Sequence, residues 1–294
     1  MNGPDGNPLF LERLSRVAPF GVCFRDVATG KAVGDGLNVT AFPPGDPDNV
    51  VPGFPNRQGV NILAGLPGLH EVEYGSGDQK FWDSLPPRRP FVLQVTDTRS
   101  RYQPFRLPID LPVRDLFPWE EEPGASPPGP VPCIPLYPAP SQKAPAGFGV
   151  VRAELLDSVS DTPAAWAMVE AFAGEQRIGR SYSDMRGRVM VLFPYPGPQA
   201  NVFGSPADSS PPEGTVRFTD SQWTILLRVL YSPRPVPPPI PDLTTVHQQP
   251  QALVLFNQSP PVSELESKLE FGRELILRSP SRSDLLIVPA GSPR

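Results

Sequence analysis

Residues 164–173 read Ala-Ala-Trp-Ala-Met-Val-Glu-Ala-Phe-Ala, and residues 183–193 read Ser-Asp-Met-Arg-Gly-Arg-Val-Met-Val-Leu-Phe. The first stretch is a short apolar run, and the second leads from a polar turn into a β-branched and aromatic strand. Asp184 can bond its own backbone two residues on, and Gly187 tolerates a positive φ, so a tight turn is expected between them. The two stretches predict a scaffold of strands, and nothing in them carries chemistry.

The same succession of elements occurs earlier in the chain, which predicts an internal duplication. Three pairs of segments match, and both segments of the third pair contain a turn glycine. Gly21 and Gly59 are 38 positions apart (59 − 21), and so are Gly149 and Gly187 (187 − 149). A second apolar strand follows each copy, at 91–95 and 223–231. The alternative is chance similarity between short β-rich segments, but the shared order of four elements favours duplication. The matching pairs are 21–26 with 149–154, 39–42 with 169–172, and 56–60 with 184–188.

This order of strand, turn, Val-x-Ala-Phe strand, Asp-x-x-Gly turn and aromatic strand resembles the carboxypeptidase regulatory-like domain. The resemblance covers roughly residues 17–113 and 147–232, and Asn56 stands where the turn of that family has Asp. Domains of this family are transthyretin-like β-sandwiches. The resemblance therefore implies an all-β chain with two tandem transthyretin-like (Ig-like) sandwiches.

Length and composition agree with this organisation. A chain of 294 residues suggests about two domains, and 44 prolines with 25 glycines argue against a helical protein. The linker holds Glu120-Glu121-Glu122 followed by closely spaced prolines, a composition typical of a semi-rigid spacer. We expect five segments: an N-terminal arm (1–16), a first β-sandwich (17–113), a Pro-rich linker (114–146), a second β-sandwich (147–232) and a Pro-rich C-terminal extension with short strands (233–294).

Charge and hydropathy exclude several classes of partner. The formal net charge is −5 without a Lys/Arg run, so the electrostatic footprint of nucleic-acid binding is missing. No apolar stretch is long enough for membrane insertion, and the N-terminus lacks the pattern of a secretory signal. We therefore expect synthesis and assembly in the cytoplasm, with release or membrane association only as part of a larger particle. Cys23 and Cys133 either form a disulfide or stay as two reduced thiols, and a cytosolic location favours the thiols.

No constellation of residues marks a reaction centre. His70, at the start of an expected strand over 70–74, and His247 are far apart, and no Cys or His cluster has metal-ligand spacing. We predict no catalytic residue, no cofactor and no metal, and hence a protein that is not an enzyme. Asp97 and Arg101 can pair, but a loop pair in solvent is expected to add little stability.

Apolar residues in the last third of the chain predict an interface. In the strand 189–193, both faces are apolar, so Met190 and Leu192 need a cover, supplied by the C-terminal extension or by another subunit. A two-stranded hairpin is marginal alone in water, so we expect the extension to add strands to a partner or to lie on its surface. The competing hypothesis is that the extension folds back and completes the second sandwich. The candidate interface residues of the extension are Leu275, Ile276, Leu277, Leu285, Leu286 and Ile287.

The function expected from these features is structural. The tandem sandwiches, the run 101–108 and the segments 269–275 and 285–289 resemble transthyretin-like accessory proteins of phage-tail-like contractile injection systems. This resemblance implies a baseplate-associated or bracing component whose partners are other protein subunits of baseplate or sheath type. One alternative is an adhesive module for carbohydrate or cell surfaces, with Trp82, Trp119 and Tyr137 stacking on sugars. Another is a regulatory appendage of a separately encoded enzyme.

Overall fold

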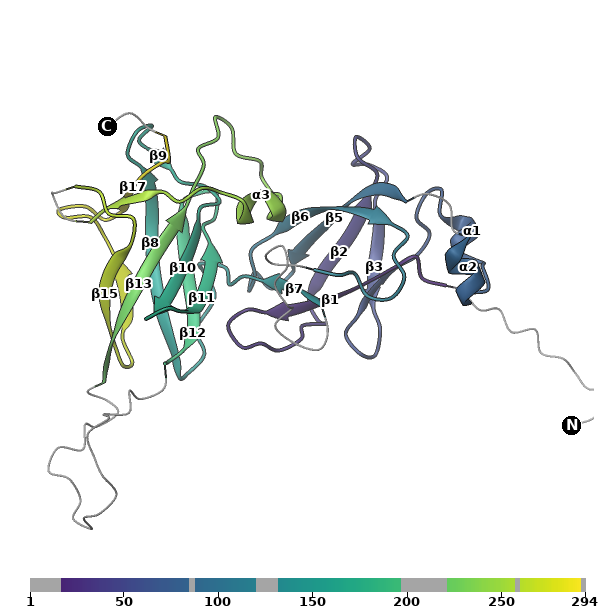
Figure 1. Ribbon diagram of the computed structural model, residues 1–294, viewed down its shortest axis with the longest axis horizontal. Coiled ribbons are helices and arrows are strands. Elements are labelled where there is room, and N and C mark those ends of the chain that lie inside the picture. Colours follow the sequence, from purple (N-terminus) through teal and green to yellow (C-terminus); the bar gives the residue numbers. More distant parts are fainter. Residues whose placement is uncertain (1–16, 85–87, 120–131, 197–220, 257–259, 292–294) are drawn as a thin grey trace, which may run out of the picture.

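The computed structural model describes residues 17–84, 88–119, 132–196, 221–256 and 260–291. The expected arm at 1–16 and the acidic run at 120–122 lie outside these residues. The described chain is built mostly of strands, with three short helices, and the strands form two groups side by side (Figure 1). We call them the N-terminal half (residues 17–142) and the C-terminal half (residues 143–291).

The N-terminal half is one hydrogen-bonded series of seven strands in the order β6-β5-β2-β3-β4-β1-β7. Its buried side chains, among them Phe20, Phe24, Leu93 and Phe105, form a single core. Two short helices, α1 and α2, lie at its outer end (Figure 1). The elements are β1 (Phe20–Asp26), β2 (Leu37–Phe42), β3 (Val51–Pro55), β4 (Asn61–Leu63), α1 (His70–Glu73), α2 (Gln79–Asp83), β5 (Arg89–Asp97), β6 (Phe105–Leu111) and β7 (Cys133–Leu136).

The C-terminal half packs a four-stranded sheet, β11-β10-β13-β15, against a second sheet that contains β12-β8-β17-β14, with β16 and β9 also paired to β8. Side chains from both sheets fill one core between them. The elements are β8 (Phe148–Asp157), β9 (Thr162–Pro163), β10 (Met168–Ala173), β11 (Gln176–Tyr182), β12 (Arg188–Pro194), β13 (Gln222–Leu230), α3 (Leu243–His247), β14 (Leu253–Leu255), β15 (Leu265–Glu270), β16 (Glu274–Leu277) and β17 (Leu285–Val288).

The two halves share one pattern of strand pairing. In the N-terminal half, β1 pairs antiparallel with β4, β2 with β3, β2 with β5, and β5 with β6, and β7 runs parallel to β1. In the C-terminal half, the corresponding pairs are β8 with β12, β10 with β11, β10 with β13, and β13 with β15, and β17 runs parallel to β8. This agreement supports the duplication that the sequence predicts.

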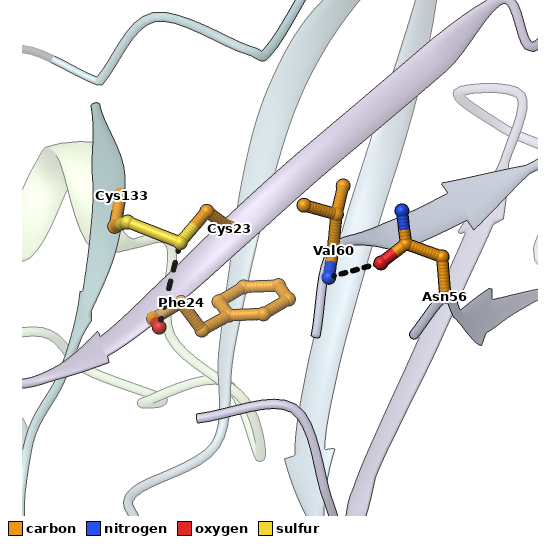
Figure 2. Close-up of a disulfide and its surroundings, with 5 residues drawn as sticks. All are labelled: Cys23, Phe24, Asn56, Val60 and Cys133. Carbon is orange, nitrogen blue, oxygen red and sulfur yellow. Dashed lines mark hydrogen bonds between the residues drawn. A yellow bond between two sulfur atoms is a disulfide. The ribbon is translucent and has the colours of Figure 1, made fainter. Parts of the chain in front are cut away.

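The turn before β4 and the turn before β12 are built by the same hydrogen bonds. The Asn56 carboxamide oxygen accepts from the N–H of Gln58 at 2.9 Å and from the N–H of Val60 at 3.0 Å, and Figure 2 shows the second of these bonds. The Asp184 carboxylate accepts from the N–H groups two and four residues on, at 2.8 and 3.0 Å. Asn56 therefore accepts the same two hydrogen bonds as Asp184 does, because the turn needs only a side-chain oxygen at this position.

The first prediction concerns the glycines of these two turns, which both have a positive φ, +80° at Gly59 and +76° at Gly187. A Cβ on Gly187 would also collide with the carbonyl oxygen of Leu155, whereas a Cβ on Gly59 meets only ordinary contacts. Gly59→Ala is expected to cost about 1–2 kcal/mol of unfolding free energy, and Gly187→Ala considerably more. Urea denaturation measures both. Gly174→Ala, at φ +60° with open space around it, is the control and should resemble Gly59→Ala.

The alignment of the two copies differs from the predicted one at its start. Asp26 ends β1 and accepts from the N–H groups of Ala28 and Thr29, and Asp157 ends β8 and accepts from the corresponding two N–H groups. These aspartates are 131 positions apart (157 − 26), whereas Asn56 and Asp184 are 128 apart (184 − 56). The predicted match of Gly21 with Gly149 is therefore wrong by three residues, and the equal 38-residue spacing is a coincidence.

Each copy also extends further along the chain than the sequence predicts. The expected linker, 114–146, contains β7, which pairs with β1 through Leu136 and Asp26. The expected extension, 233–294, contains β17, which pairs with β8 through Ile287 and Asp157. The residue after each aspartate donates its N–H to the last strand of the same copy. Val27 donates to the carbonyl of Leu136 at 3.2 Å, and Ser158 donates to the carbonyl of Ile287 at 2.9 Å. The boundaries predicted at 113 and 232 cut off the last strands of both copies.

The prediction that the extension is held outside the second sandwich is therefore wrong for its strands, whereas α3 of the same segment packs in the core of the N-terminal half. Leu265, Leu269, Leu277, Leu285 and Ile287 are buried in the core of the C-terminal half, and their strands pair with β13 and β8. The physical reason is that β8 has a free edge in the predicted sandwich, and the parallel strands β16 and β17 fill it. For these strands, the competing hypothesis that the segment folds back and completes the second sandwich is the one observed.

The two cysteines form a disulfide, which corrects the expectation of two reduced thiols. Cys23 lies in β1 and Cys133 lies opposite it in β7 (Figure 2). The sequence separation of 110 residues hid this proximity, because nothing in the sequence shows that residues 133–136 form a strand beside β1.

Two smaller expectations also change. Residues 70–73 form α1 and not a strand, since Leu66, Leu69 and Val72 recur every third residue and are buried together. The Asp97–Arg101 pair is not a loosely solvated one: the Asp97 side chain is fully buried, and Arg101 binds both of its oxygens, at 3.0 and 3.1 Å. Burial raises the pKa of Asp97, but the bonds and charge of Arg101 outweigh this and lower it.

Candidate functional site: the junction between the halves

A set of aromatic contacts and hydrogen bonds joins the two halves of the described structure. Tyr137 follows β7 and is buried against residues of the C-terminal half. Its ring packs edge-on to Tyr182 and His247, with centroids 5.3 and 5.7 Å away. Its hydroxyl lies 2.9 Å from Nε2 of His247. The residue that the sequence places in a spacer is thus the centre of an aromatic cluster.

Tyr182, the last residue of β11, is held by the N-terminal half at two points. Its hydroxyl donates to the carbonyl of Pro104 at 3.1 Å, and its own carbonyl accepts from Nε2 of Gln103 at 3.1 Å. Complete burial, with Tyr137 nearby, raises the pKa of Tyr182 well above its usual value. A buried tyrosine satisfied at both ends fixes the orientation of one half against the other.

A proline-rich strap, residues 233–242, crosses from the C-terminal half back to the N-terminal half. Nε1 of Trp166 donates to the carbonyl of Pro238 at 3.0 Å, and the N–H of Arg106 donates to the carbonyl of Pro241 at 2.7 Å. The strap leads into α3, whose Leu243 and Val246 are fully buried in the core of the N-terminal half. Figure 1 shows α3 between the two groups of strands. One core therefore contains residues from both halves.

The two halves are also in contact at the outer face of β12. Met190 and Leu192 are buried against Ala28 of the N-terminal half and Ala144 of the predicted linker. Beside them, Arg152 of β8 donates to the carbonyl of Pro140 at 2.6 Å and also reaches that of Gln142. The expectation that this face needs a cover is correct, but the cover is neither of the two that were expected.

The second prediction concerns the neutral histidine in the junction. Burial, reinforced by the charges of Arg180 and Arg177, lowers the pKa of His247 to about 3. The unfolded chain, with an ordinary histidine pKa near 6.5, binds the extra proton between these two values. Stability from this group is therefore present above pH 6.5 and lost as the pH falls toward 3.

The variant His247→Gln should lose this pH dependence. Its unfolding free energy should therefore fall less steeply with decreasing pH than that of the wild type, and the two slopes should differ by up to about 1.4 kcal/mol per pH unit. Chemical denaturation of both proteins between pH 7 and pH 4 measures the two slopes. Parallel slopes would show that His247 is not held neutral.

The predicted interface residues mostly lie inside the chain. Leu277, Leu285 and Ile287 are core residues, Leu275 packs against that core, and Leu286 is half-buried. Ile276, at 52% exposure, points to solvent. With Met190 and Leu192 covered as well, the structure leaves Ile276 as the exposed member of the set.

The aromatic residues considered for sugar stacking are not gathered on a surface. Tyr137 is buried, the Trp119 ring packs against His247 at 5.6 Å, and Trp82 lies in α2 at the far end of the N-terminal half. No local pattern marks the other junction residues, Gln103, Tyr182 and Gln249, because their partners are 79, 78 and 83 positions away.

Neither a metal-binding cluster nor a membrane-spanning helix occurs among the described residues. No group of three or more His, Cys, Asp or Glu residues there is arranged to hold a metal ion. None of the helices found there is long and apolar enough to cross a membrane.

Comparisons with known proteins add little. No family model matches the chain, and no curated protein matches its sequence. Among solved structures, the TIE protein of Bacillus anthracis is similar at 9% identity and a TM-score of 0.23, over 94% of this chain. The chain spans about a third of that protein (34%). The shaft pilin SpaA of Lactobacillus rhamnosus GG, an E139A mutant, is similar at 10% identity and a TM-score of 0.23, over 94% of this chain and 99% of the pilin. Scores this low establish no family.

Proposed function

We propose that this protein is a rigid, non-catalytic structural subunit made of two tandem transthyretin-like β-sandwiches that act as one body. The observation that supports the proposal is that hydrogen bonds and a shared apolar core join the two halves. Tyr182 is bonded at both ends by the N-terminal half, and α3 contributes Leu243 and Val246 to the N-terminal core. Domains that move freely meet through small polar interfaces, whereas a shared apolar core resists relative motion.

The assembly that such a subunit serves is, in this proposal, a phage-tail-like contractile injection particle, where it braces or decorates the baseplate. The support is the sequence resemblance of the tandem sandwiches and of the segments 101–108, 269–275 and 285–289. Its partners would be other subunits of baseplate or sheath type. A body of fixed shape is what a brace requires, because a hinge would let the braced parts move.

The test is the composition of assembled particles. Particles sedimented from the native source should contain this chain at a fixed ratio to the sheath protein, measured by quantitative mass spectrometry. Deleting its gene should give particles with altered baseplates in electron micrographs. If the chain is absent from sedimented particles and elutes only as a free monomer, the proposed role is wrong.

A further inference from the structure

A cleft of about 480 Å³ is lined by the outer face of the N-terminal sheet and by the proline-rich strap. On the sheet side, Phe42 of β2 lies opposite Val92 of β5, and Val92 lies opposite Pro108 of β6. These residues alternate with core residues along their strands, so they face away from the core. The strap contributes Pro238 and Ile240, and the loop after β2 contributes two prolines. Most of the lining is therefore apolar.

Both walls of the cleft are fixed before any ligand arrives. The strap is tied to the sheet by the N–H of Arg106, which donates to the carbonyl of Pro241 at 2.7 Å. It is tied to the C-terminal half by Trp166, whose Nε1 donates to the carbonyl of Pro238 at 3.0 Å. The prolines also restrict φ along the strap. A cleft built in this way costs little ordering entropy when it is filled.

Two arginines line this apolar cleft, and neither is paired with a carboxylate of the described chain. Arg234, in the strap, makes no hydrogen bond and no ion pair within the described residues. Arg106 uses Nε to donate to Oε1 of Gln94 at 2.9 Å, and its guanidinium carbon lies 5.5 Å from the centre of the Phe42 ring. The terminal nitrogens of Arg106 have no hydrogen-bond partner in that part of the chain.

The lining also contains one acidic residue, Asp242. Its Oδ1 accepts from the N–H of Thr245 at 3.0 Å and so caps the start of α3. It forms no ion pair with Arg106 or Arg234 in the described structure. Two guanidinium groups and one carboxylate leave the lining with a charge of +1, on a chain whose net charge is −5. Clefts lined by an excess of one sign of charge concentrate ligands of the opposite sign.

We propose that this cleft binds a small molecule that carries one carboxylate on an apolar body. The guanidinium fork of an arginine matches a carboxylate with two parallel hydrogen bonds. The apolar walls bury the rest of the ligand, and the volume lies within the range of small-molecule sites. A carboxylate carries one negative charge, which balances the lining, whereas a phosphate monoester carries nearly two.

The experiment is an NMR titration of the ¹⁵N-labelled full-length chain with 3-phenylpropanoate. Two controls each remove one feature of this probe: 3-phenylpropanamide lacks the charge, and acetate lacks the apolar body. The arginine Nε–Hε signals of Arg106 and Arg234 should shift and saturate with a Kd of about 1 mM or below, as expected for a ligand of this size. Both controls should bind at least about tenfold more weakly.

Variants of the lining locate the site. Arg234→Gln should weaken binding about tenfold, the loss of a hydrogen bond to a charged group, and Ile240→Ala about fivefold, the loss of apolar contact. Because Arg234 holds no other residue in place, its substitution leaves the fold intact, and the ¹H–¹⁵N spectrum checks this. Arg278→Gln is the matched control, since Arg278 is exposed and does not line the cleft. It should bind like the wild type.

Saturable binding of 3-phenylpropanoate that depends on Arg234 and Ile240 supports the proposal. Absence of saturation at about ten times the expected Kd, equal affinity for the amide, or an equal loss in Arg278→Gln would overturn it. Tighter binding of phenyl phosphate would overturn the assignment to carboxylates. The proposal goes beyond the structural role and does not rest on it, because none of these results depends on particle assembly.

Discussion

Deleting residues 232–294 is expected to unfold the C-terminal half. The deletion removes β15, β16 and β17, which pair with β13 and β8, together with buried leucines of the core. It also removes α3, and with it Leu243 and Val246 from the N-terminal core. A sandwich without these strands exposes an apolar face and two unpaired strand edges. Circular dichroism and proteolysis of the truncated chain should show a disordered C-terminal half.

Point substitutions give the same test without a large deletion. Leu285→Ala empties a buried core position and is expected to cost about 2–5 kcal/mol of unfolding free energy. Ile276→Ala, in β16 but half exposed, should cost less than about 0.5 kcal/mol. If both variants melt like the wild type, or if the truncated chain keeps a cooperative transition of its C-terminal half, these strands are not part of the core.

Removing the disulfide should be the second large effect. The bond joins β7, a strand of four residues, to β1. Because it closes a loop of 110 residues, it restricts the unfolded chain strongly, and losing it is expected to cost about 3–5 kcal/mol. The double variant Cys23→Ser/Cys133→Ser should unfold at a lower urea concentration than the oxidised wild type.

The wild type under a strong reductant provides the control and should approach the double variant. Alkylation of the unreduced, denatured protein should find no free thiol. Equal midpoints for the oxidised wild type and the double variant would show that the two cysteines are not paired in the folded protein.

The sequence allowed the local features of this fold to be predicted. Alternating apolar residues gave most strands, and Asp184 with Gly187 gave the turn before β12, which Asn56 and Gly59 repeat. Local patterns of this kind depend on neighbouring residues, so a single sequence shows them. Short strands were also expected in the C-terminal segment, and β14 and β17 are two of the strands found there.

The sequence did not show which strands would become neighbours. Cys133, Tyr137 and the last strands were assigned to a linker and to an extension because prolines surround them. Their partners, Cys23, His247 and β8, lie 110 or more positions away. The junction depends on such pairs throughout, so no local pattern marks it.

The claim that the two halves form one rigid body is tested most directly by a distance distribution across the junction. Nitroxide labels on cysteines placed at Lys80 of α2 and at Glu175, in the exposed turn between β10 and β11, sample the two halves. Double electron–electron resonance should give one narrow distance distribution, which broadens in the variant Tyr182→Ala. A broad distribution in the protein with an intact junction would contradict the account.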